Sequence, residues 1–509
     1  MSTHPSSDLE HFFITTPIFY VNASPHLGHL FSAVTADCLH RYKLLQGFTS
    51  KFSTGTDEHG LKIQQAAEAA GRDPLSFCTD VSERFKHLFV KCNISYTDYI
   101  RTTDPVADAS DSTGKRIKIS LESGHKVEWM KEENYMFRLS KFRGQLLDWL
   151  TGNPGAIQPE RFYQDVLQWL QEELPDLSVS RQRSRLQWGI PVPGDPEQTV
   201  YVWLDALVNY LTVAGYPDDH RLWWNSATHV IGKDILKFHA IYWPAFLLGA
   251  GLPLPQAVRV HSHWTVEGKK MSKSVGNVVD PIEKSQMFTA DGLRYFLLRQ
   301  GVPDSDCDYY DSKVVKVLNA ELADSLGGLL NRCTALALNP AQRYPPFCTE
   351  LFHGTMGRAT PEDHHMLDAV RDLPSVVERH YESLRVYKAL EAIGGCVRLT
   401  NGFVQRHAPW KLNSGDEGDR RWLDTLLHVA FECLRTYGTL LQPVVPEISN
   451  KLLSRLGVGP DHRSWAALSF LPRSRGMACP FEGRALGSDS GVLFSRLDPV
   501  NTDNRKPRH

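Results

Sequence analysis

Largely apolar runs and amphipathic segments alternate along the first part of the chain. A run at 12–16 predicts a buried strand. Over 26–46 apolar residues recur about once per turn, which predicts a helix that ends near Gly47. Ser24, followed by Pro25, is the expected N-cap of this helix, with proline in its first turn. The chain is therefore expected to pass from a strand into a helix through a short turn.

The same order of elements continues downstream. A strand is expected at 49–54, and helices follow at 61–70 and at about 81–90. Strands that alternate with helices are typical of a parallel sheet with helices packed on its faces. Residues 12–97 are therefore predicted to form the first half of a doubly wound sheet, and residues 179–310 its second half.

Long amphipathic patterns replace the strand signals from 311 to 472. Apolar residues at helical spacing form one stripe, composed of Val386, Leu390, Ile393 and Val397. The predicted fold class is therefore α/β: a doubly wound, Rossmann-type parallel sheet followed by an all-α helical bundle. The remaining segments are a polar N-terminal stretch at 1–11, a connection at 98–178 and a Gly/Ser/Pro-rich tail at 473–509.

Composition narrows the class of protein. The 509 residues are 42% hydrophobic and carry a net charge of −2, so the chain is not a general binder of polyanions. The nine cysteines show no C-x-x-C spacing, which predicts free thiols and no zinc knuckle. The longest apolar run, 241–252, contains Pro244 and is too short to span a bilayer. No membrane partner is expected.

Two imidazoles lie at the start of the first predicted helix. His26 and His29 are three residues apart, and Gly28 between them leaves room for a ligand. A helix N-terminus offers oriented N–H groups and the positive end of the helix dipole, which favours a phosphate. The turn is a candidate phosphate site, and two solvated histidines on a surface helix are the alternative.

A lysine-rich loop lies far down the chain. Lys269, Lys270 and Lys273 stand among small and polar residues at 266–277, a composition suited to neutralising phosphate charge. By itself, such a segment is usually a solvated basic loop. The two stretches together resemble the paired signatures of class I aminoacyl-tRNA synthetases: His26-Leu-Gly-His29 matches the HIGH motif and Lys270-Met-Ser-Lys-Ser274 matches KMSKS.

The residues around these motifs are similar to the methionyl-tRNA synthetases, most closely to the mitochondrial form. The matching stretches, in chain order, are Thr16-Pro-Ile-Phe-Tyr-Val-Asn22, Gly55-Thr-Asp-Glu-His-Gly60, Trp188-Gly-Ile-Pro-Val-Pro-Gly194, Tyr201-Val-Trp-Leu-Asp-Ala206 and Ile231-Gly-Lys-Asp-Ile235 with His239. The resemblance implies that 12–97 and 179–310 form the catalytic domain and that 311–472 binds the anticodon. It also implies a ligase that joins methionine to tRNA(Met) through methionyl-adenylate.

The resemblance assigns roles residue by residue. His26, His29, Lys270 and Lys273 would be catalytic and, together with Gly28 and Asp234, would bind ATP, although a plain salt bridge is an equal alternative for Asp234. Asp57 would hold the ammonium group of methionine. The methionine pocket would be completed by Ile18, Tyr20, Trp203, Ala206, Tyr210, Ile235 and His239. Aromatic and aliphatic walls suit a thioether side chain, and core packing is the alternative for 201–211.

The anticodon would be read within the helical bundle. Trp410 is expected just past a helix end, where an aromatic ring can stack on an unpaired base, and Arg332 would lie near it. Basic residues outnumber acidic ones between Arg379 and Lys411. Gly328 stands where the family commonly has Asn. A buried core position is the alternative for Trp410.

The connection at 98–178 departs from the family. The family carries an inserted segment here, often with a zinc-bound knuckle, and most of it is missing, so no structural zinc is expected. Alternative splicing, a gene-model error or a tolerated deletion would each produce this gap. It leaves open a tRNA-binding or regulatory variant without charging activity. A different adenylate-forming nucleotidyl transferase is a third interpretation. The helical bundle and Trp410 argue against it, because such an enzyme does not need to read an anticodon.

The resemblance also implies the surroundings of the protein. Magnesium would enter with ATP, because Mg²⁺ binds mainly through substrate phosphates, and a monomer is expected. The family form favours the mitochondrial matrix. Residues 1–11 contain acidic residues and no Arg or Lys, unlike a transit peptide, so the N-terminus itself favours the cytosol.

Overall fold

The computed structural model describes residues 10–104, 133–271, 276–354, 357–412, 416–468, 479–488 and 491–499. The chain divides into two compact units. We call the first the sheet unit, formed by His11–Ala36 and Ser50–Ser262, and the second the helical unit, formed by Met1–Glu10, Asp37–Thr49 and His263–His509. Residues 263–310, which were predicted to belong to the second half of the catalytic fold, are thus counted with the helical unit.

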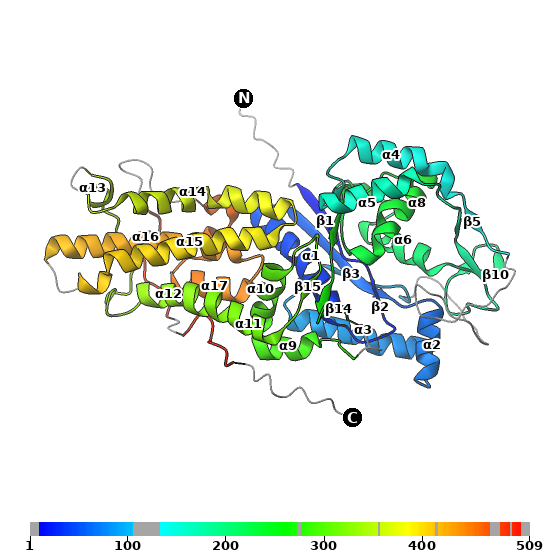
Figure 1. Cartoon of the computed structure of the whole chain (residues 1–509), viewed down its shortest axis with the longest axis horizontal. Helices are drawn as coiled ribbons and strands as arrows, with labels where there is room; N and C mark the ends of the chain where they lie inside the picture. The colour runs from blue at the N-terminus through cyan, green and yellow to red at the C-terminus, as the bar shows by residue number, and fades with distance from the viewer. Residues whose placement is uncertain are drawn as a thin grey trace. The chain divides into compact units, whose positions relative to one another are not determined.

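A parallel sheet forms the centre of the sheet unit (Figure 1). Its strands follow the order β2-β3-β1-β11-β12-β6, and β4 pairs with β3. This arrangement confirms the predicted doubly wound, parallel architecture. The strands are β1 (His11–Thr15), β2 (Phe19–Tyr20), β3 (Thr49–Asp57), β4 (Asp98–Arg101), β6 (Ile157–Gln158), β11 (Thr228–Gly232) and β12 (Ala257–His261).

Most local predictions for this unit are confirmed within a few residues. The helix predicted at 26–46 is α1 (Leu27–Gln46), whose residues from Asp37 on are counted with the helical unit. The helices predicted at 61–70 and 81–90 are α2 (Leu61–Ala69) and α3 (Pro74–Lys91); α3 starts earlier because Asp73 accepts a hydrogen bond from the Ser76 N–H as its N-cap.

The predicted N-cap of α1 is wrong. The helix begins at Leu27, so Ser24 and Pro25 lie before it and His26 occupies the capping position. The local composition favoured the serine, but the two histidines supply the capping contacts themselves, as described below.

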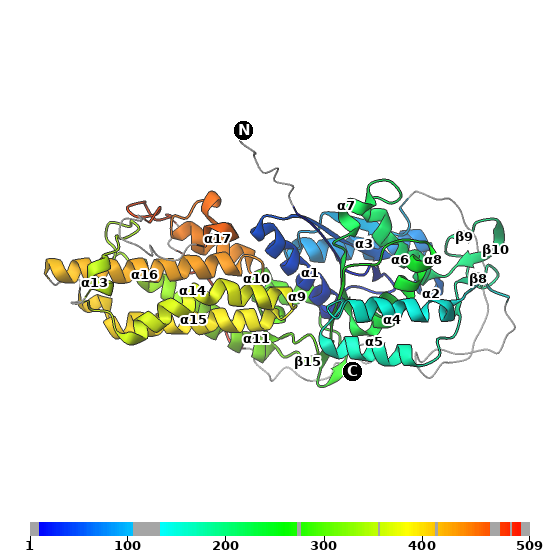
Figure 2. The same ribbon diagram turned by 90° about the horizontal axis from the view of Figure 1, so that it is seen from above.

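Helices and small sheets cover the rest of the sheet unit, and α4 and α5 lie side by side in Figure 2. Two apolar clusters lie against the parallel strands. One includes Leu146, Val166, Ile231 and Val258, and the other includes Phe13, Tyr210, Trp224 and Trp243. The elements are β5 (Met136–Phe137), η1 (Leu139–Phe142), α4 (Arg143–Gly152), α5 (Glu160–Gln171), β7 (Leu177–Ser178), β8 (Ser180–Gln182), β9 (Pro191–Val192), β10 (Asp195–Val200), α6 (Val202–Ala214), α7 (His220–Trp224), η2 (Lys233–Ile235), η3 (Phe238–Tyr242) and α8 (Trp243–Gly249).

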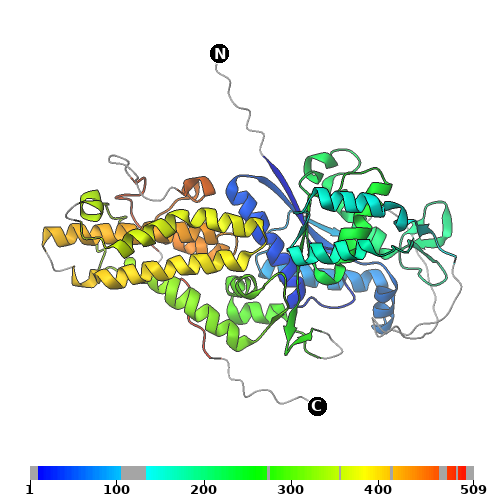
Figure 3. The same ribbon diagram turned by 45° about the horizontal axis from the view of Figure 1, so that its top comes forward.

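The helical unit contains the predicted bundle. The long helices α14 (Pro361–Glu382), α15 (Val386–His407) and α16 (Glu417–Leu441) run alongside one another, which is clear in Figure 3, where they are coloured yellow to orange. The predicted stripe is confirmed, because Val386, Leu390, Ile393 and Val397 are all buried. The other helices are α9 (Pro281–Phe288), α10 (Ala290–Gln300), α11 (Asp311–Leu318), η4 (Asn319–Gly327), α12 (Gly328–Cys333), α13 (Thr349–His353), η5 (Pro409–Lys411), α17 (Pro446–Arg455), η6 (Pro460–His462) and η7 (Trp465–Ala467).

A buried ion pair lies inside this unit. Arg294 of α10 and Asp37 of α1 have fully buried side chains, with 2.6 Å between Nη2 and Oδ2. Arg294 also donates to the carbonyl oxygens of Val444 at 2.8 Å and Pro443 at 3.0 Å, and Arg41 donates to Asp37 at 2.8 Å. The pair therefore ties α1, α10 and the chain before α17 together.

Candidate active site and tRNA-reading surface

Loops that follow the parallel strands carry most of the predicted site residues. Asp57 ends β3, and Asp234 lies two residues past the end of β11. Carboxyl ends of parallel strands meet at one edge of a sheet, which is where open α/β sheets bind ligands. The sheet unit thus brings the predicted ATP and methionine residues of its loops to one edge.

The side chains of His26 and His29 each accept a backbone hydrogen bond at the start of α1. The Gly28 N–H donates to His26 Nδ1 at 3.0 Å, and the His26 N–H donates to His29 Nδ1 at 3.1 Å. The two rings stack with centroids 3.8 Å apart. This reciprocal pattern is that of a capping box, built from two imidazoles.

The capping contacts determine which ring nitrogen carries the proton. A neutral imidazole has one N–H, and Nδ1 accepts a hydrogen bond in both rings, so the proton of each neutral ring lies on Nε2. Burial and the neighbouring His26 lower the pKa of His29 well below its ordinary value, although Asp234 acts in the opposite direction. His29 is therefore neutral at physiological pH and has an Nε2–H donor.

Glycine is required between the two histidines. A Cβ atom on Gly28 would lie 2.9 Å from His26 Cε1 and 3.1 Å from His26 Nδ1. Such a contact would displace the His26 ring from the Gly28 N–H. The glycine thus permits the ring to fold back onto the helix end.

Asp57 is a buried carboxyl group with a strongly perturbed pKa. Burial raises the pKa well above its ordinary value, the neighbouring Asp205 and Glu58 add to the shift, and a hydrogen bond from the His59 N–H opposes it. Asp205 is itself paired with His59 Nδ1 at 2.7 Å. An arriving ammonium group would favour the ionised form of Asp57, as expected of a site for an amino group.

Glu58 holds the loop that carries Asp57, and the sequence did not single it out. Its fully buried carboxylate accepts two 2.8 Å hydrogen bonds from Arg101 and a 2.7 Å bond from Thr56. Its carbonyl oxygen accepts a 2.5 Å hydrogen bond from the indole N–H of Trp188. A charged residue directly after Asp57 was the available signal, but its partners are distant in sequence.

The predicted methionine-pocket residues differ in exposure. Ile18, Ala206, Tyr210 and His239 are buried, whereas Tyr20, Trp203 and Ile235 are half-buried. Trp203 stacks on Phe238, a residue that the sequence did not single out, with centroids 3.7 Å apart. Ring contacts therefore connect α6 and η3, two of the elements that carry the predicted pocket residues.

Burial keeps the polar groups of this layer neutral, and hydrogen bonds connect them. His239 Nδ1 lies 3.0 Å from the Ile235 carbonyl oxygen and its Nε2 lies 2.8 Å from the Tyr210 hydroxyl, so Nδ1–H donates and Tyr210 donates to Nε2. His229, which the sequence did not single out, packs on the Tyr210 ring and lies 2.8 Å from the Thr15 hydroxyl. Burial lowers the pKa of His229 well below its ordinary value, so this layer holds no charge at neutral pH.

Acidification is expected to destabilise the protein through His239. Burial lowers its pKa to about 4, so below the ordinary value of 6.5 the unfolded chain takes up a proton that the folded chain does not. Stability contributed by the neutral ring is complete above pH 6.5 and is lost as the pH falls toward 4. We expect His239 to contribute about 2 kcal/mol to the loss of stability between about pH 7.5 and about pH 5 in urea unfolding, and the pH dependence of His239→Gln to be flatter by that amount. Equal pH dependences for the two proteins would contradict this assignment.

Lys270 lies at the end of a short hairpin in the helical unit. β13 (Trp264–Val266) pairs with β14 (Lys269–Lys270), and β15 (Cys307–Asp308) pairs with β13. The turn residues Glu267 and Gly268 both have positive φ, at 54° and 72°. Asp308 accepts hydrogen bonds from the Gly268 N–H at 2.9 Å and from Thr265, so it anchors the turn. Lys270 is exposed, and Lys273 lies outside the described residues.

The predicted anticodon residues lie on the bundle. Arg332 of α12 donates to Asn401 of α15 and to the Gly328 carbonyl oxygen at 3.2 Å. Trp410 lies in η5, directly after α15, and its side chain is 47% exposed. The alternative of a buried core tryptophan is therefore wrong. Its ring is accessible to a base.

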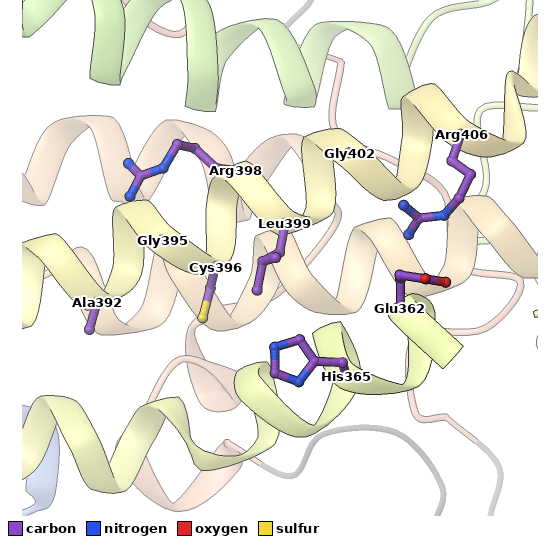
Figure 4. Close-up of a pocket in the computed structure, with 9 residues that line it drawn as sticks. All are labelled: Glu362, His365, Ala392, Gly395, Cys396, Arg398, Leu399, Gly402 and Arg406. Atoms are coloured by element: carbon purple, nitrogen blue, oxygen red, sulfur yellow. The ribbon is translucent and has the colours of Figure 1, made fainter. Parts of the chain in front are cut away.

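A groove of about 610 Å³ lies between α14 and α15. Figure 4 shows Glu362 of α14 near Arg406 of α15, and His365 of α14 opposite Cys396 and Leu399. The other lining residues are Ala392, Gly395, Cys396, Arg398, Leu399 and Gly402. The groove runs along α15 from Ala392 to Arg406, and its Arg406 end is the one nearer to Trp410 in the chain.

The described residues offer neither a cluster of metal ligands nor a helix that could span a membrane. Within the described ranges, no group of three or more His, Cys, Asp or Glu side chains is arranged to hold a metal ion. Every helix in the part of the chain that the structure describes is too short or too polar to cross a bilayer.

Comparison with known families gives two matches along the chain. A family model described as "tRNA synthetases class I (M)" matches residues 12–112 and 108–334. A second model, "Anticodon binding domain of methionyl tRNA ligase", matches residues 354–481. The two pieces of the first match meet at 108–112, within the connection predicted to be shortened.

Several known proteins are similar over nearly the whole chain. The mitochondrial methionine–tRNA ligase of Takifugu rubripes is 69% identical over 546 positions, which cover 99% of this chain and 92% of that protein. The Homo sapiens protein of the same name is 57% identical, with 96% and 91% covered. The alignment with the Takifugu rubripes protein is longer than the 509 residues of this chain, so that protein carries residues that this chain lacks.

Solved structures agree with this relationship. Mycobacterium tuberculosis methionyl-tRNA synthetase in complex with methionyl-adenylate superposes with a TM-score of 0.86 at 34% identity, and the match covers 96% of this chain and 100% of that one. Sequence, structure and both family models therefore lead to the same conclusion: the chain belongs to the methionyl-tRNA synthetase family of class I tRNA synthetases.

Proposed function

We propose that this chain is a methionine–tRNA ligase that acts in mitochondria. It activates methionine with ATP to form methionyl-adenylate and pyrophosphate, and it then transfers the methionyl group to tRNA(Met). The observation that carries this proposal is the first turn of α1. There two imidazoles accept backbone hydrogen bonds through Nδ1, so each neutral ring has its N–H donor at Nε2. The similarity to mitochondrial relatives supports the compartment, which we refine to the matrix.

The first step joins the methionine carboxylate to the α-phosphorus of ATP. An oxygen of the carboxylate attacks phosphorus, the bond from phosphorus to the bridging oxygen breaks, and pyrophosphate leaves with its magnesium ion. His26 and His29 donate Nε2–H bonds to the phosphate oxygens as charge builds on them, and Lys270 and Lys273 neutralise pyrophosphate. Magnesium enters as part of the ATP substrate complex.

Methionine is held by its ammonium group and by its side chain. Asp57 binds the ammonium group, while Asp234 binds the ribose of the neighbouring ATP. The side chain lies among Ile18, Tyr20, Trp203, Ala206, Tyr210, Ile235 and His239. A neutral, mostly apolar lining favours a thioether over a polar side chain, because the polar groups of Tyr210 and His239 already satisfy each other.

In the second step, a terminal hydroxyl of tRNA attacks the carbonyl carbon of methionyl-adenylate and AMP leaves. The helical unit selects the tRNA through Trp410 and Arg332, and the chain acts as a monomer. A tRNA-binding protein without charging activity is not favoured, because the comparisons match both the catalytic and the anticodon-binding family models.

Methionine-dependent exchange of labelled pyrophosphate into ATP tests this proposal. Exchange that requires methionine, and that leucine does not support, is the expected result. A folded preparation without exchange would refute the catalytic proposal while leaving tRNA binding open to a separate filter-binding measurement.

Trp410→Ala is expected to raise the KM for tRNA about tenfold or more, because stacking of one base on an aromatic ring contributes about 1–3 kcal/mol. Pyrophosphate exchange, which needs no tRNA, provides the comparison. Trp410→Phe keeps a ring and should retain most of the charging rate. Equal losses of exchange and charging in Trp410→Ala would show that the ring does not act through the anticodon.

A further inference from the structure

A buried carboxylate lies at the junction of α14 and α15. Asp363, in the first turn of α14, has a fully buried side chain. Its Oδ2 accepts a hydrogen bond from the Thr360 N–H at 2.7 Å, which completes the cap of α14. Oδ2 can still accept a second hydrogen bond, and Oδ1 is also available to donors from α15.

Two basic side chains at the end of α15 share this carboxylate. Arg406 donates to Asp363 Oδ1 from Nη2 at 2.5 Å and from Nε at 3.2 Å. His407 Nε2 lies 2.7 Å from Asp363 Oδ2. Burial by itself would raise the pKa of Asp363, but hydrogen bonds from His407, the Thr360 N–H and Arg406 hold it well below its ordinary value. The acid is therefore ionised and fully paired.

His407 is also fixed by aromatic packing. Its ring lies edge-on to Phe403 of α15, with centroids 5.0 Å apart, and edge-on to Trp422 of α16, with centroids 5.2 Å apart. The last residue of α15 is thus held by a hydrogen bond to α14 and by a ring from α16. Its position cannot change without disturbing both neighbouring helices.

The chain that leaves this junction leads directly to Trp410. Ala408 ends α15 in the left-handed region, at φ 42°, which is unusual for a residue other than glycine. Pro409 is buried, and the Lys411 N–H donates to the Ala408 carbonyl oxygen at 2.8 Å. The exposed Trp410 ring therefore projects from a short, constrained turn whose entry is set by His407.

We propose that Asp363 is a positioning residue for anticodon recognition. By holding Arg406 and His407, it fixes the end of α15 and the left-handed turn at Ala408, so that the Trp410 ring is presented to the base in one orientation before tRNA arrives. An ordered ring loses less conformational freedom on stacking, and binding is tighter as a result. This inference rests on the proposed role of Trp410.

Asp363→Asn tests the inference in the full-length chain. Asparagine has nearly the same shape and can still accept from the Thr360 N–H, but it lacks the charge that holds Arg406 and His407. The KM for tRNA is expected to rise about tenfold, while kcat for charging and the rate of pyrophosphate exchange stay within about twofold of the parent chain. A raised KM with an unchanged kcat corresponds to a loss of tRNA binding alone.

A double variant separates positioning from general support. If Asp363 acts through the ring, Asp363→Asn combined with Trp410→Ala charges tRNA no worse than Trp410→Ala by itself. If the two losses multiply, Asp363 does not act through Trp410 and the inference is overturned. Asp419→Asn is the matched control, since it breaks the more exposed ion pair with Arg358, 2.7 Å long, and should leave charging unchanged.

Two further results complete the test. Should Asp363→Asn fail to fold by circular dichroism, His407→Gln and His407→Leu replace it: glutamine can donate to Asp363 and should preserve the KM for tRNA, whereas leucine should raise it. Equal KM values in those two variants would overturn the inference. An unchanged KM in Trp410→Ala would refute both the anticodon role and this inference, whereas a raised KM there with an unchanged KM in Asp363→Asn would refute the inference by itself.

Discussion

His26→Asn is expected to fold as the parent chain does and to lose about 10²- to 10³-fold of methionine-dependent pyrophosphate exchange, the loss typical of removing one donor to a charge that develops in the transition state. Asparagine places an oxygen near the position of Nδ1 and is a favourable N-cap, so the Gly28 N–H keeps its acceptor. It has no group at the position of Nε2. Helix capping and phosphate binding are therefore separated in one substitution.

His26→Gln is the matched control for that experiment. The glutamine amide reaches the position of Nε2 and can donate to phosphate, but it leaves the Gly28 N–H without its side-chain acceptor. We expect partial recovery of exchange together with a lower thermal midpoint. If asparagine and glutamine reduce exchange equally, the Nε2–H of His26 is not the donor that matters.

Arg294→Leu is expected to lower the stability of the helical unit by about 3–5 kcal/mol, the range found when one partner of a buried ion pair is removed. Asp37 would remain buried without the guanidinium group of Arg294, and the carbonyl oxygens of Val444 and Pro443 would lose this donor. Urea unfolding followed by limited proteolysis of the helical unit measures the effect.

An exposed arginine provides the control for the stability experiment. Arg496 pairs with Asp324 at 2.5 Å, but both side chains are more than half exposed. Arg496→Ala should change stability by about 0.5 kcal/mol or less, as is usual for exposed pairs. A comparable loss in the two variants would mean that burial does not determine the contribution of these ion pairs.

Local patterns predicted the fold well where one period dominates. The 3.6-residue pattern over 26–46 placed α1 within one residue of its start, and the stripe from Val386 to Val397 identified the core face of α15. The N-cap of α1 was wrongly assigned to Ser24 because the residue preference for capping is weaker than the actual contacts of His26 and His29. Those contacts depend on side-chain geometry that no spacing rule expresses.

Residues with distant partners were the ones that the sequence could not identify. Glu58 and Arg101 are separated by 43 positions, and His229 and Thr15 by 214. Nothing in the neighbourhood of either residue indicates its partner, because the pairing arises only when parallel strands lie next to each other. The resemblance to a family supplied most site residues, but the residues that support them had to come from the structure.

The network around Glu58 bears on how the family tolerates a shortened connection. Arg101 and Thr103, at one end of the interval, and Trp188, at the other, all bind the same residue, through its carboxylate or its carbonyl oxygen. Both ends of the intervening chain are therefore anchored at one point beside Asp57. In evolutionary terms, the support of the amino-acid site is inherited together with the two anchor points, so a change in chain length between them need not alter the geometry beside Asp57.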